Sequence, residues 1–531
     1  MKKNSNAILA VVLWAIALFF PGCTGNFENM NKNPYGATNE DIKADLLPAS
    51  LRVAQLNIYI YTPPWDTQLQ QNLLADVYSG YMMPPTPFRG NSNNMNYDLV
   101  DAWNVFAFVP TYDNVMNPIA TVEEFTGKEA SQKDLYAMAK IIKAEAMHRV
   151  SDIFGPVIYS KYKQAEADGT VQYDSQEEAY NHFFEDLKTA IDILTPLSSS
   201  ASSIQFKAAD LAYGGSYSKW LKFANSLRLR LAIRIAKVNA TKAKREGEAA
   251  LAGAGGLISE NNESFFVDFG TTNHPLNIMN NEWSDVRMGA PMESVLGGYN
   301  DPRLPKYFVA AIDPVATGQF KGIRNGINID AKTRYQDYSK LITFANKVQL
   351  MTAAEVWFLK AEAALRGWTG AGSPQTNYEK GIQVSFEQHG LSARASAYIN
   401  DAVSKPKEYK DPKAITAGQN DVLNGNPNLS TITIKWDEAA SEERKLERVI
   451  TQKWIAVYPD GQEAWSEFRR TGYPKLFPVV INNSGGKITG FIKRINFVNN
   501  EYSTNKAAVE KAVTMLGGPD TGGTSLWWDA D

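Results

Sequence analysis

Two stretches of the sequence combine aromatic rings with amide, carboxylate and guanidinium groups. Tyr81 and Tyr97 enclose the first stretch, which also contains Arg89, and Trp283 begins the second. A sugar ring has an apolar face that packs on a flat aromatic ring, and its hydroxyl groups need polar partners. Both stretches therefore favour carbohydrate binding, although packing in the core is an equal alternative for each side chain. The predicted ligand contacts are Tyr81, Asn96, Tyr97, Trp283, Arg287 and Tyr299.

Residue patterns that support catalysis do not occur in the sequence. The four histidines are isolated, and none forms the HExxH pattern of a zinc hydrolase. No Gly-rich phosphate loop and no GxSxG nucleophile motif is present. A glycoside hydrolase would need two carboxylates about 5–9 Å apart, which the spacing of the acidic residues neither shows nor excludes. We predict a protein that is not an enzyme, with no catalytic residue, cofactor or metal; a surface glycoside hydrolase is the alternative.

The adjacent pair Arg469 and Arg470 could bind a carboxylate group of a ligand in a bidentate manner. Buried ion pairs that tie loops together are the more frequent use of such residues, and we favour that interpretation. Trp454 and Trp465 lie on or beside helical stripes. We therefore assign them to the core.

Composition and charge exclude several classes of protein. The 531 residues are 44% hydrophobic and 21% charged, with a formal net charge of -3. This is ordinary globular composition, and it offers no clustered basic face for nucleic acid. A single cysteine cannot form an internal disulfide. The fold must therefore be held by its core.

The N-terminal residues have the pattern of a bacterial lipoprotein signal. Lys2 and Lys3 precede an apolar run, residues 8–20, that is shorter than the ~20 residues of a membrane span. Cys23 follows Gly22, which resembles a lipobox, and a free cysteine after an ordinary signal is the alternative. We expect lipid anchoring through Cys23. The predicted organisation is a signal peptide (1–22), a polar tether (23–40) and one domain (41–531).

Apolar residues recur at helical spacing through much of the chain. Such stripes occupy residues 131–150, 175–194 and 220–235, and they recur at 353–365 and 446–457. Small residues and aromatics alternate in 353–363 and 377–382 as in a tetratricopeptide helix pair, and 131–150 with 175–194 resembles an earlier pair. Long segments rich in Asn, Gly and Pro separate the helices; they are 62–103, 260–340 and 400–430. The sequence predicts a mainly α scaffold that carries elaborate loops.

Several blocks of the sequence resemble the SusD/RagB family of outer-membrane lipoproteins. The most specific block is residues 450–474, which includes Tyr458-Pro459-Asp460-Gly461 and Phe468-Arg469-Arg470-Thr471-Gly472. Further blocks are 27–34, 151–160, 220–230 and 527–529. The segment 494–505 departs from the family pattern, because Phe497-Val498 replaces the usual Tyr-Pro.

The resemblance implies a mainly α fold in which tetratricopeptide-like helix pairs support a loop-rich ligand-binding half. It implies a lipid-anchored protein on the outer membrane of Bacteroidetes-type bacteria, at the cell surface, where it caps a SusC-type TonB-dependent transporter and supplies it with oligosaccharide. It also implies that the stretches around Tyr81–Tyr97 and Trp283–Tyr299 converge. A peptide ligand, and an adaptor with no ligand, are the alternatives within this architecture. No nucleic acid partner is expected.

Overall fold

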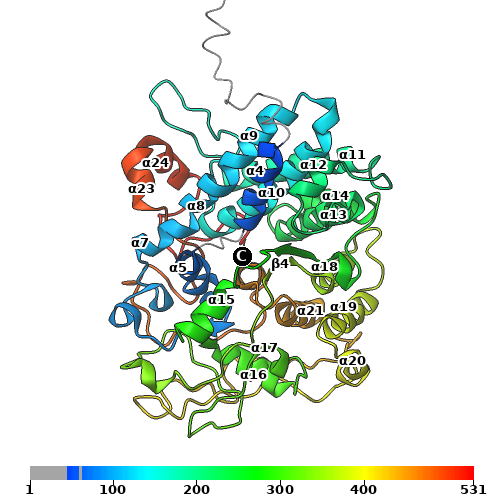
Figure 1. Cartoon of the computed structure of the whole chain (residues 1–531). Coiled ribbons are helices and arrows are strands. Elements are labelled where there is room, and N and C mark those ends of the chain that lie inside the picture. Colours follow the sequence, from blue (N-terminus) through cyan, green and yellow to red (C-terminus); the bar gives the residue numbers. More distant parts are fainter. Residues whose placement is uncertain (1–44, 59–62, 531) are drawn as a thin grey trace, which may run out of the picture. The chain divides into compact units, whose positions relative to one another are not determined.

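Helices form about 50% of the part of the chain that the structure describes, and strands form little of it (Figure 1). The structure is a computed structural model, and it describes residues 45–58 and 63–530. The described residues from Leu47 onward belong to one compact unit. The predicted signal peptide, lipidated Cys23 and polar tether lie outside the described residues. The predicted mainly α fold is confirmed.

Pairs of helices supply the framework. Their bounds are α10 Lys133–Phe154 with α11 Gln176–Leu194, α13 Tyr217–Arg234 with α14 Ala240–Leu251, α18 Ala353–Leu365 with α19 Pro374–Gln388, and α21 Glu442–Ala456 with α22 Gly461–Thr471. The two helices of each pair contact each other, and α11 and α18 both contact α13. The two helix pairs predicted from the sequence are therefore present, one as α10 with α11 and the other as α18 with α19. Within the described residues, no helix combines the length and apolarity that a membrane span requires.

The framework helices begin where the sequence provides a side-chain cap. At the start of α11, the Ser175 hydroxyl accepts from the Glu178 amide at 3.2 Å, and the Glu178 carboxylate accepts from the Ser175 amide at 2.8 Å. The Asp460 carboxylate accepts from the Glu463 amide at 3.1 Å and caps α22 in the same way. These bonds satisfy amides that have no partner inside the helix.

A glycine allows α18 and α19 to approach closely. A β-carbon at Gly381 would lie 2.8 Å from the Phe358 ring, which is fully buried. The aromatic ring of one helix thus fills the space that the missing side chain leaves on the other. This is the small-residue contact that the sequence predicts for a tetratricopeptide-like pair.

Buried ion pairs connect the framework helices to one another. Arg230 of α13 pairs with Glu355 of α18 at 2.7 Å. Arg234 of α13 bonds both Glu463 and Glu467 of α22. All five side chains are at most 5% exposed. Such charges tolerate burial only when each is paired, so the network specifies how the helices pack.

The remaining elements are short, and many of them lie within the three segments that the sequence analysis treats as loops. The α-helices are α4 Leu47–Leu56, α5 Pro64–Thr67, α6 Ala75–Tyr78, α7 Asp101–Asn104, α8 Val109–Thr111, α9 Asn117–Thr126, α12 Ile204–Ala209, α15 Pro275–Asn277, α16 Ala290–Gly298, α17 Leu304–Tyr307, α20 Ser392–Ile399, α23 Asn499–Thr504 and α24 Lys506–Thr514. The 3-10 and π turns are η2 Gln68–Asn72, η3 Phe88–Asn91, η4 Asn94–Asn96, η5 Val105–Ala107, η6 Tyr112–Met116, η7 Ala130–Gln132, η8 Asn261–Glu263, η9 Ile278–Glu282 and η10 Lys332–Arg334. The strands are β1 Met82–Met83, β2 Phe265–Asp268, β3 Arg287–Met288 and β4 Lys347–Met351.

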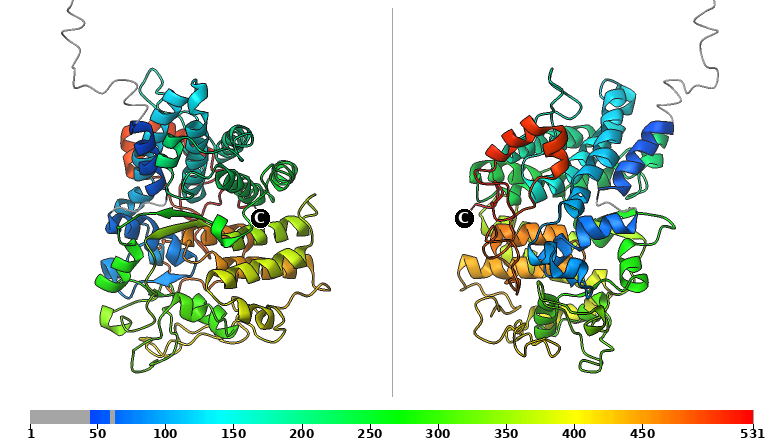
Figure 2. Two further views of the ribbon diagram at one scale, coloured as in Figure 1. Left: turned by 45° about the vertical axis from the view of Figure 1, so that its right-hand side comes forward. Right: turned by 90° about the vertical axis from the view of Figure 1, so that its left-hand side faces the viewer.

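Both views of Figure 2 separate a helical end from a loop-rich end. The cyan and teal helices, including α10 and α11, gather at one end, and α16 lies among the loops at the other. The antiparallel pair β2–β4 leads into the framework, because a single residue separates the end of β4 from the start of α18. The loop-rich end thus rests on the framework.

Candidate functional site

The two aromatic stretches predicted to converge do so through a short strand pair. β1 and β3 are antiparallel, with Met82 opposite Met288 and Met83 opposite Arg287. Beyond the strands, the Thr86 hydroxyl donates to the Asp285 carboxylate at 2.5 Å. The loop that follows β1 and the turn that precedes β3 therefore lie side by side.

Trp283 stands at this junction in a turn held by charged groups. Its ring is partly buried, and the next residue, Ser284, has a φ of 57°. Lys332 donates to the Trp283 carbonyl at 2.6 Å and to the Asp285 carboxylate at 2.7 Å. A non-glycine residue with positive φ is uncommon and needs such support. The backbone that carries the ring is thus held in position before any ligand arrives.

The loop after β1 also contains non-glycine residues with a positive φ. Arg89 and Asn91 have φ values of 52° and 68°. The Asn91 amide donates to the Ile329 carbonyl at 3.0 Å, and its oxygen accepts from the Ile329 amide at 3.1 Å. The Phe88 ring packs edge-on against Trp103 at 6.1 Å. These contacts leave the Arg89 side chain exposed at the surface.

Trp65 is a surface aromatic that the site prediction omits. It is 57% exposed and belongs to α5, which contacts α15. Figure 1 shows α5 and α15 beside each other. Because α15 leads directly into η9 and then Trp283, the two indoles lie on neighbouring segments. The sequence indicates the start of this helix through Pro63-Pro64, because proline favours the first helical position. Trp65 follows directly and therefore lies in the first turn.

Three of the predicted contact residues have their side chains in the interior. The Tyr81 hydroxyl donates to the Trp454 carbonyl, and its ring lies 5.0 Å from the Trp454 ring. Tyr299 is 2% exposed, and its hydroxyl donates to the Ile432 carbonyl at 3.1 Å. Arg287 is fully buried and donates to the carbonyls of Val286 and Gln336, while burial lowers its pKa to about 10. Tyr81, Arg287 and Tyr299 can therefore influence a surface site by positioning its loops.

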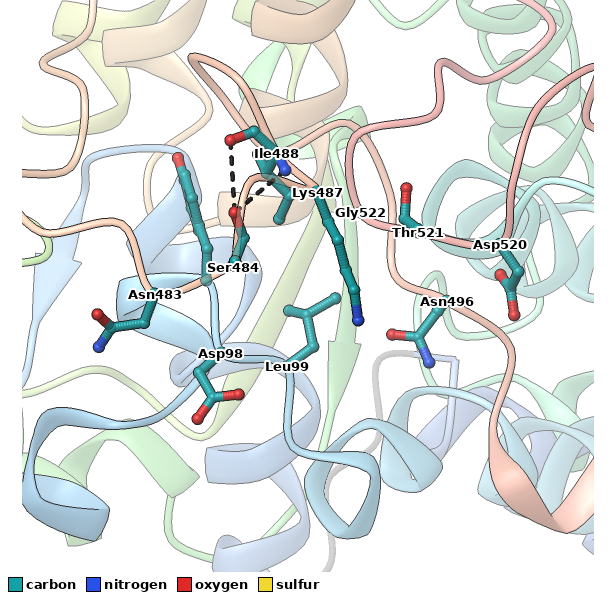
Figure 3. Close-up of a pocket in the computed structure, with 12 residues that line it drawn as sticks. Asp98, Leu99, Asn483, Ser484, Lys487, Ile488, Asn496, Asp520, Thr521 and Gly522 are labelled. Carbon is teal, nitrogen blue, oxygen red and sulfur yellow. Dashed lines mark hydrogen bonds between the residues drawn. The ribbon is translucent and has the colours of Figure 1, made fainter.

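Asn96 and Tyr97 lie next to a polar cavity of about 430 Å³ (Figure 3). Tyr97 lines this cavity but is only 4% exposed, and burial raises its pKa. The Asn96 carbonyl accepts from the Asn483 amide at 2.7 Å. Asn96 is 1% exposed, so it supports the wall of the cavity from behind. Residues of segments 483–488 and 520–522 complete this cavity, and no local pattern in the sequence indicates this.

The paired arginines take the structural role that the sequence analysis favours. Arg470 is fully buried and bonds the carboxylates of Glu362 and Glu467 at 2.7 Å. Arg469 donates to the Asp152 carbonyl at 2.6 Å and packs over the Trp465 ring, which is 1% exposed. Neither guanidinium is available to a ligand. Among the described residues, no group of three or more His, Cys, Asp or Glu side chains could hold a metal ion.

Comparison with solved structures shows several close relatives. A chitin-binding SusD homolog from Flavobacterium johnsoniae is 42% identical, with a TM-score of 0.86 over 92% of this chain and 99% of that one. A SusD homolog from Bacteroides vulgatus is 36% identical, with a TM-score of 0.86 over 93% of this chain and 99% of that one. A SusD-like protein from Bacteroides thetaiotaomicron is 34% identical, with a TM-score of 0.83 over 91% and 98%. A comparison with curated proteins found no match.

A family model gives the same assignment over nearly the whole sequence. The SusD-like model, described as SusD and RagB outer membrane lipoprotein, matches residues 29–529. Its members are binding proteins rather than enzymes. The match includes every block on which the resemblance was based except the first two residues of 27–34. This protein therefore belongs to the SusD-like family of outer-membrane lipoproteins.

Proposed function

We propose that this protein binds oligosaccharides at the bacterial surface and supplies them to a SusC-type TonB-dependent transporter. Lipidation at Cys23 would hold it on the outer membrane, with residues 23–40 as the tether and the remainder as the binding domain. Membership of the SusD-like family supports this role. A relative named as chitin-binding shares 42% of its residues with this chain, so oligosaccharides of the chitin type are the first candidate ligands.

The observation that carries the proposal is the supported, partly exposed Trp283 at the junction of the two loops. An aromatic ring on a fixed backbone binds the apolar face of a sugar at low entropic cost, because its two side-chain torsions are the main freedom that it loses. Arg89, which is exposed on the loop after β1, offers a guanidinium for sugar hydroxyls, and Trp65 offers a second ring. Tyr81, Arg287 and Tyr299 would maintain the loops.

The test is calorimetric titration of residues 24–531, which contain the whole compact unit, with chitin oligosaccharides and with peptides. We expect saturable oligosaccharide binding without release of shorter products. Trp283→Ala should weaken it roughly tenfold, about 1.4 kcal/mol, through loss of the stacked ring. Trp357→Ala is the matched control. Trp357 lies on the framework helix α18, its indole is also partly buried, and its ring nitrogen donates to the Ser259 carbonyl.

Each outcome of the titration has a definite meaning. Binding that resists Trp283→Ala would contradict the proposed site. If only peptides bind, the proposed transport role stands, but the proposal that the ligand is an oligosaccharide is wrong. Equal losses in the Trp283 and Trp357 variants would point to a general disturbance of the fold.

A further inference from the structure

The polar cavity beside Tyr97 is built from segments far apart in the sequence. Its wall combines residues 97–99, 483–488 and 520–522 with Asn496. Figure 3 shows the Lys487 side chain extending between Leu99 and Asn496, with Thr521 on the far side. At about 430 Å³, the cavity is at the small end of the ~300–1,000 Å³ that ligand sites occupy. It suits a single ring rather than an extended chain.

The wall is rigid, because its turns are closed by internal hydrogen bonds. The Ser484 hydroxyl accepts from the Ile488 amide at 3.1 Å and donates to its carbonyl at 3.4 Å. Asp520 accepts from Arg494 at 2.5 Å and from the Tyr502 hydroxyl at 2.8 Å. A site whose groups are already positioned loses little entropy when it binds.

Polar groups of the wall keep hydrogen-bonding capacity that no described residue uses. The ammonium of the exposed Lys487 and the hydroxyl of the half-buried Thr521 form neither a hydrogen bond nor an ion pair within residues 45–58 and 63–530. Asn496 uses its amide nitrogen on the Phe497 carbonyl at 3.0 Å, which leaves its oxygen as an acceptor. Asp98 accepts from Ser92 through one oxygen, so its second oxygen is also an acceptor.

The charges and the apolar area of the cavity lining restrict the class of ligand further. Asp520 is neutralised by the buried Arg494, and the remaining charges, Asp98 and Lys487, are opposite in sign. The lining therefore gives no net preference for an anion. Leu99 and Ile488 add an apolar area. The cavity thus combines hydrogen-bond donors, acceptors and an apolar patch around a small volume. This combination suits a neutral sugar, because sugar hydroxyls both donate and accept hydrogen bonds.

We propose that this cavity is a second carbohydrate site, separate from the Trp283 junction, that takes one neutral sugar unit. The inference extends the proposed oligosaccharide-binding function, but it depends on different residues. A cavity of this volume has room for a single or terminal unit, whereas the Trp283 junction is proposed to bind along a chain. The two sites would therefore differ in the ligand length that they require.

The test uses saturation-transfer NMR titration of residues 24–531 with N-acetylglucosamine, and with glucuronate as an anionic comparison. Lys487→Met and Thr521→Val each remove one hydrogen-bonding group with little change of shape, and each should weaken monosaccharide binding about fivefold. Lys506→Met is the matched control, because this lysine is 70% exposed on α24. This control variant should leave monosaccharide binding unchanged.

The outcomes separate this inference from the proposed function. Oligosaccharide binding without monosaccharide binding would overturn the cavity site and leave the proposed function intact. Monosaccharide binding that survives Lys487→Met and Thr521→Val but is lost in Trp283→Ala would also overturn it. Tighter binding of glucuronate would overturn the neutral assignment. Monosaccharide binding with the expected losses would support the cavity even if oligosaccharides failed to bind.

Discussion

At the scale of single residues, the interior of this protein depends on charges as much as on apolar packing. Arg470 bonds Glu362 and Glu467, and all three side chains are at most 5% exposed. Nearby cations, Arg470 first among them, overcome the effect of burial and hold the pKa of Glu467 at about 2. Each carboxylate thus stays charged inside the protein because a guanidinium accompanies it.

Arg470→Met should therefore lower the free energy of unfolding by about 3 kcal/mol, because two buried carboxylates each lose one of their cationic partners. Urea denaturation at neutral pH measures this change. Arg245→Met is a suitable control, since Arg245 is 68% exposed. A change below about 1 kcal/mol would show that the network does not hold the helices together.

Asp76 behaves in the opposite way, because burial raises its pKa to about 7. Gln71 and Asn72 donate to its carboxylate, and Gly461 is required there, since a β-carbon would lie 2.3 Å from an Asp76 oxygen. The folded state binds a proton that the unfolded state releases near pH 4. This contribution to stability is complete below about pH 4 and is lost as pH rises through about 7.

Comparison of the unfolding free energy of Asp76→Asn and the unchanged protein between pH 4.5 and 8 tests this assignment. The variant should gain roughly 3 kcal/mol relative to the unchanged protein over this range, because only the folded unchanged protein loses a proton that its unfolded state has already released. A difference that stays constant with pH would contradict the raised pKa.

Burial can be predicted from the sequence for some residues and not for others, for a physical reason. Trp465 lies beside a helical stripe, and adjacent arginines often form buried ion pairs, so their burial agrees with expectation. Tyr81 and Tyr299 stand among loops or at a helix end, where no period separates the buried face from the exposed one. Their burial therefore could not be predicted, and the ligand contacts stay a prediction. The exposure of Trp65 depends on how α5 packs, which no local pattern shows.

At the scale of elements, the helix pairs follow from local patterns, whereas the site follows from long-range contacts. Caps such as Ser175 with Glu178 and the apolar stripes mark α10, α11, α18 and α19 in the sequence. The β1–β3 pair joins residues about two hundred positions apart through only two residues each. Such a short pair has no alternation to detect.

Gly381→Ala tests the close contact between α18 and α19. The new β-carbon would overlap the Phe358 ring, and we expect a net loss of about 1–2 kcal/mol, since overpacking outweighs the ~1 kcal/mol helix preference of alanine. Thermal unfolding measures the change. Adding Phe358→Leu to Gly381→Ala should recover part of the loss. A stabilised single variant would contradict the predicted contact.

At the scale of the whole molecule, a charged helical framework supports loops whose positive-φ residues are held by cross-loop bonds. Ser284, Arg89 and Asn91 all occur around the junction of β1 and β3. The backbone there is constrained, which is typical of a preformed binding surface. The SusD-like family match and the mainly α fold agree with a helical framework that supports binding loops. The function of these loops is defined by the ligand that they bind.

A crystal structure of residues 24–531 with a chitin oligosaccharide would show whether the ligand binds at Trp283. We expect a sugar ring stacked on Trp283, with hydroxyls near Arg89 on the loop after β1. A saturating ligand bound on the helical framework, with Trp283 uncovered, would contradict it.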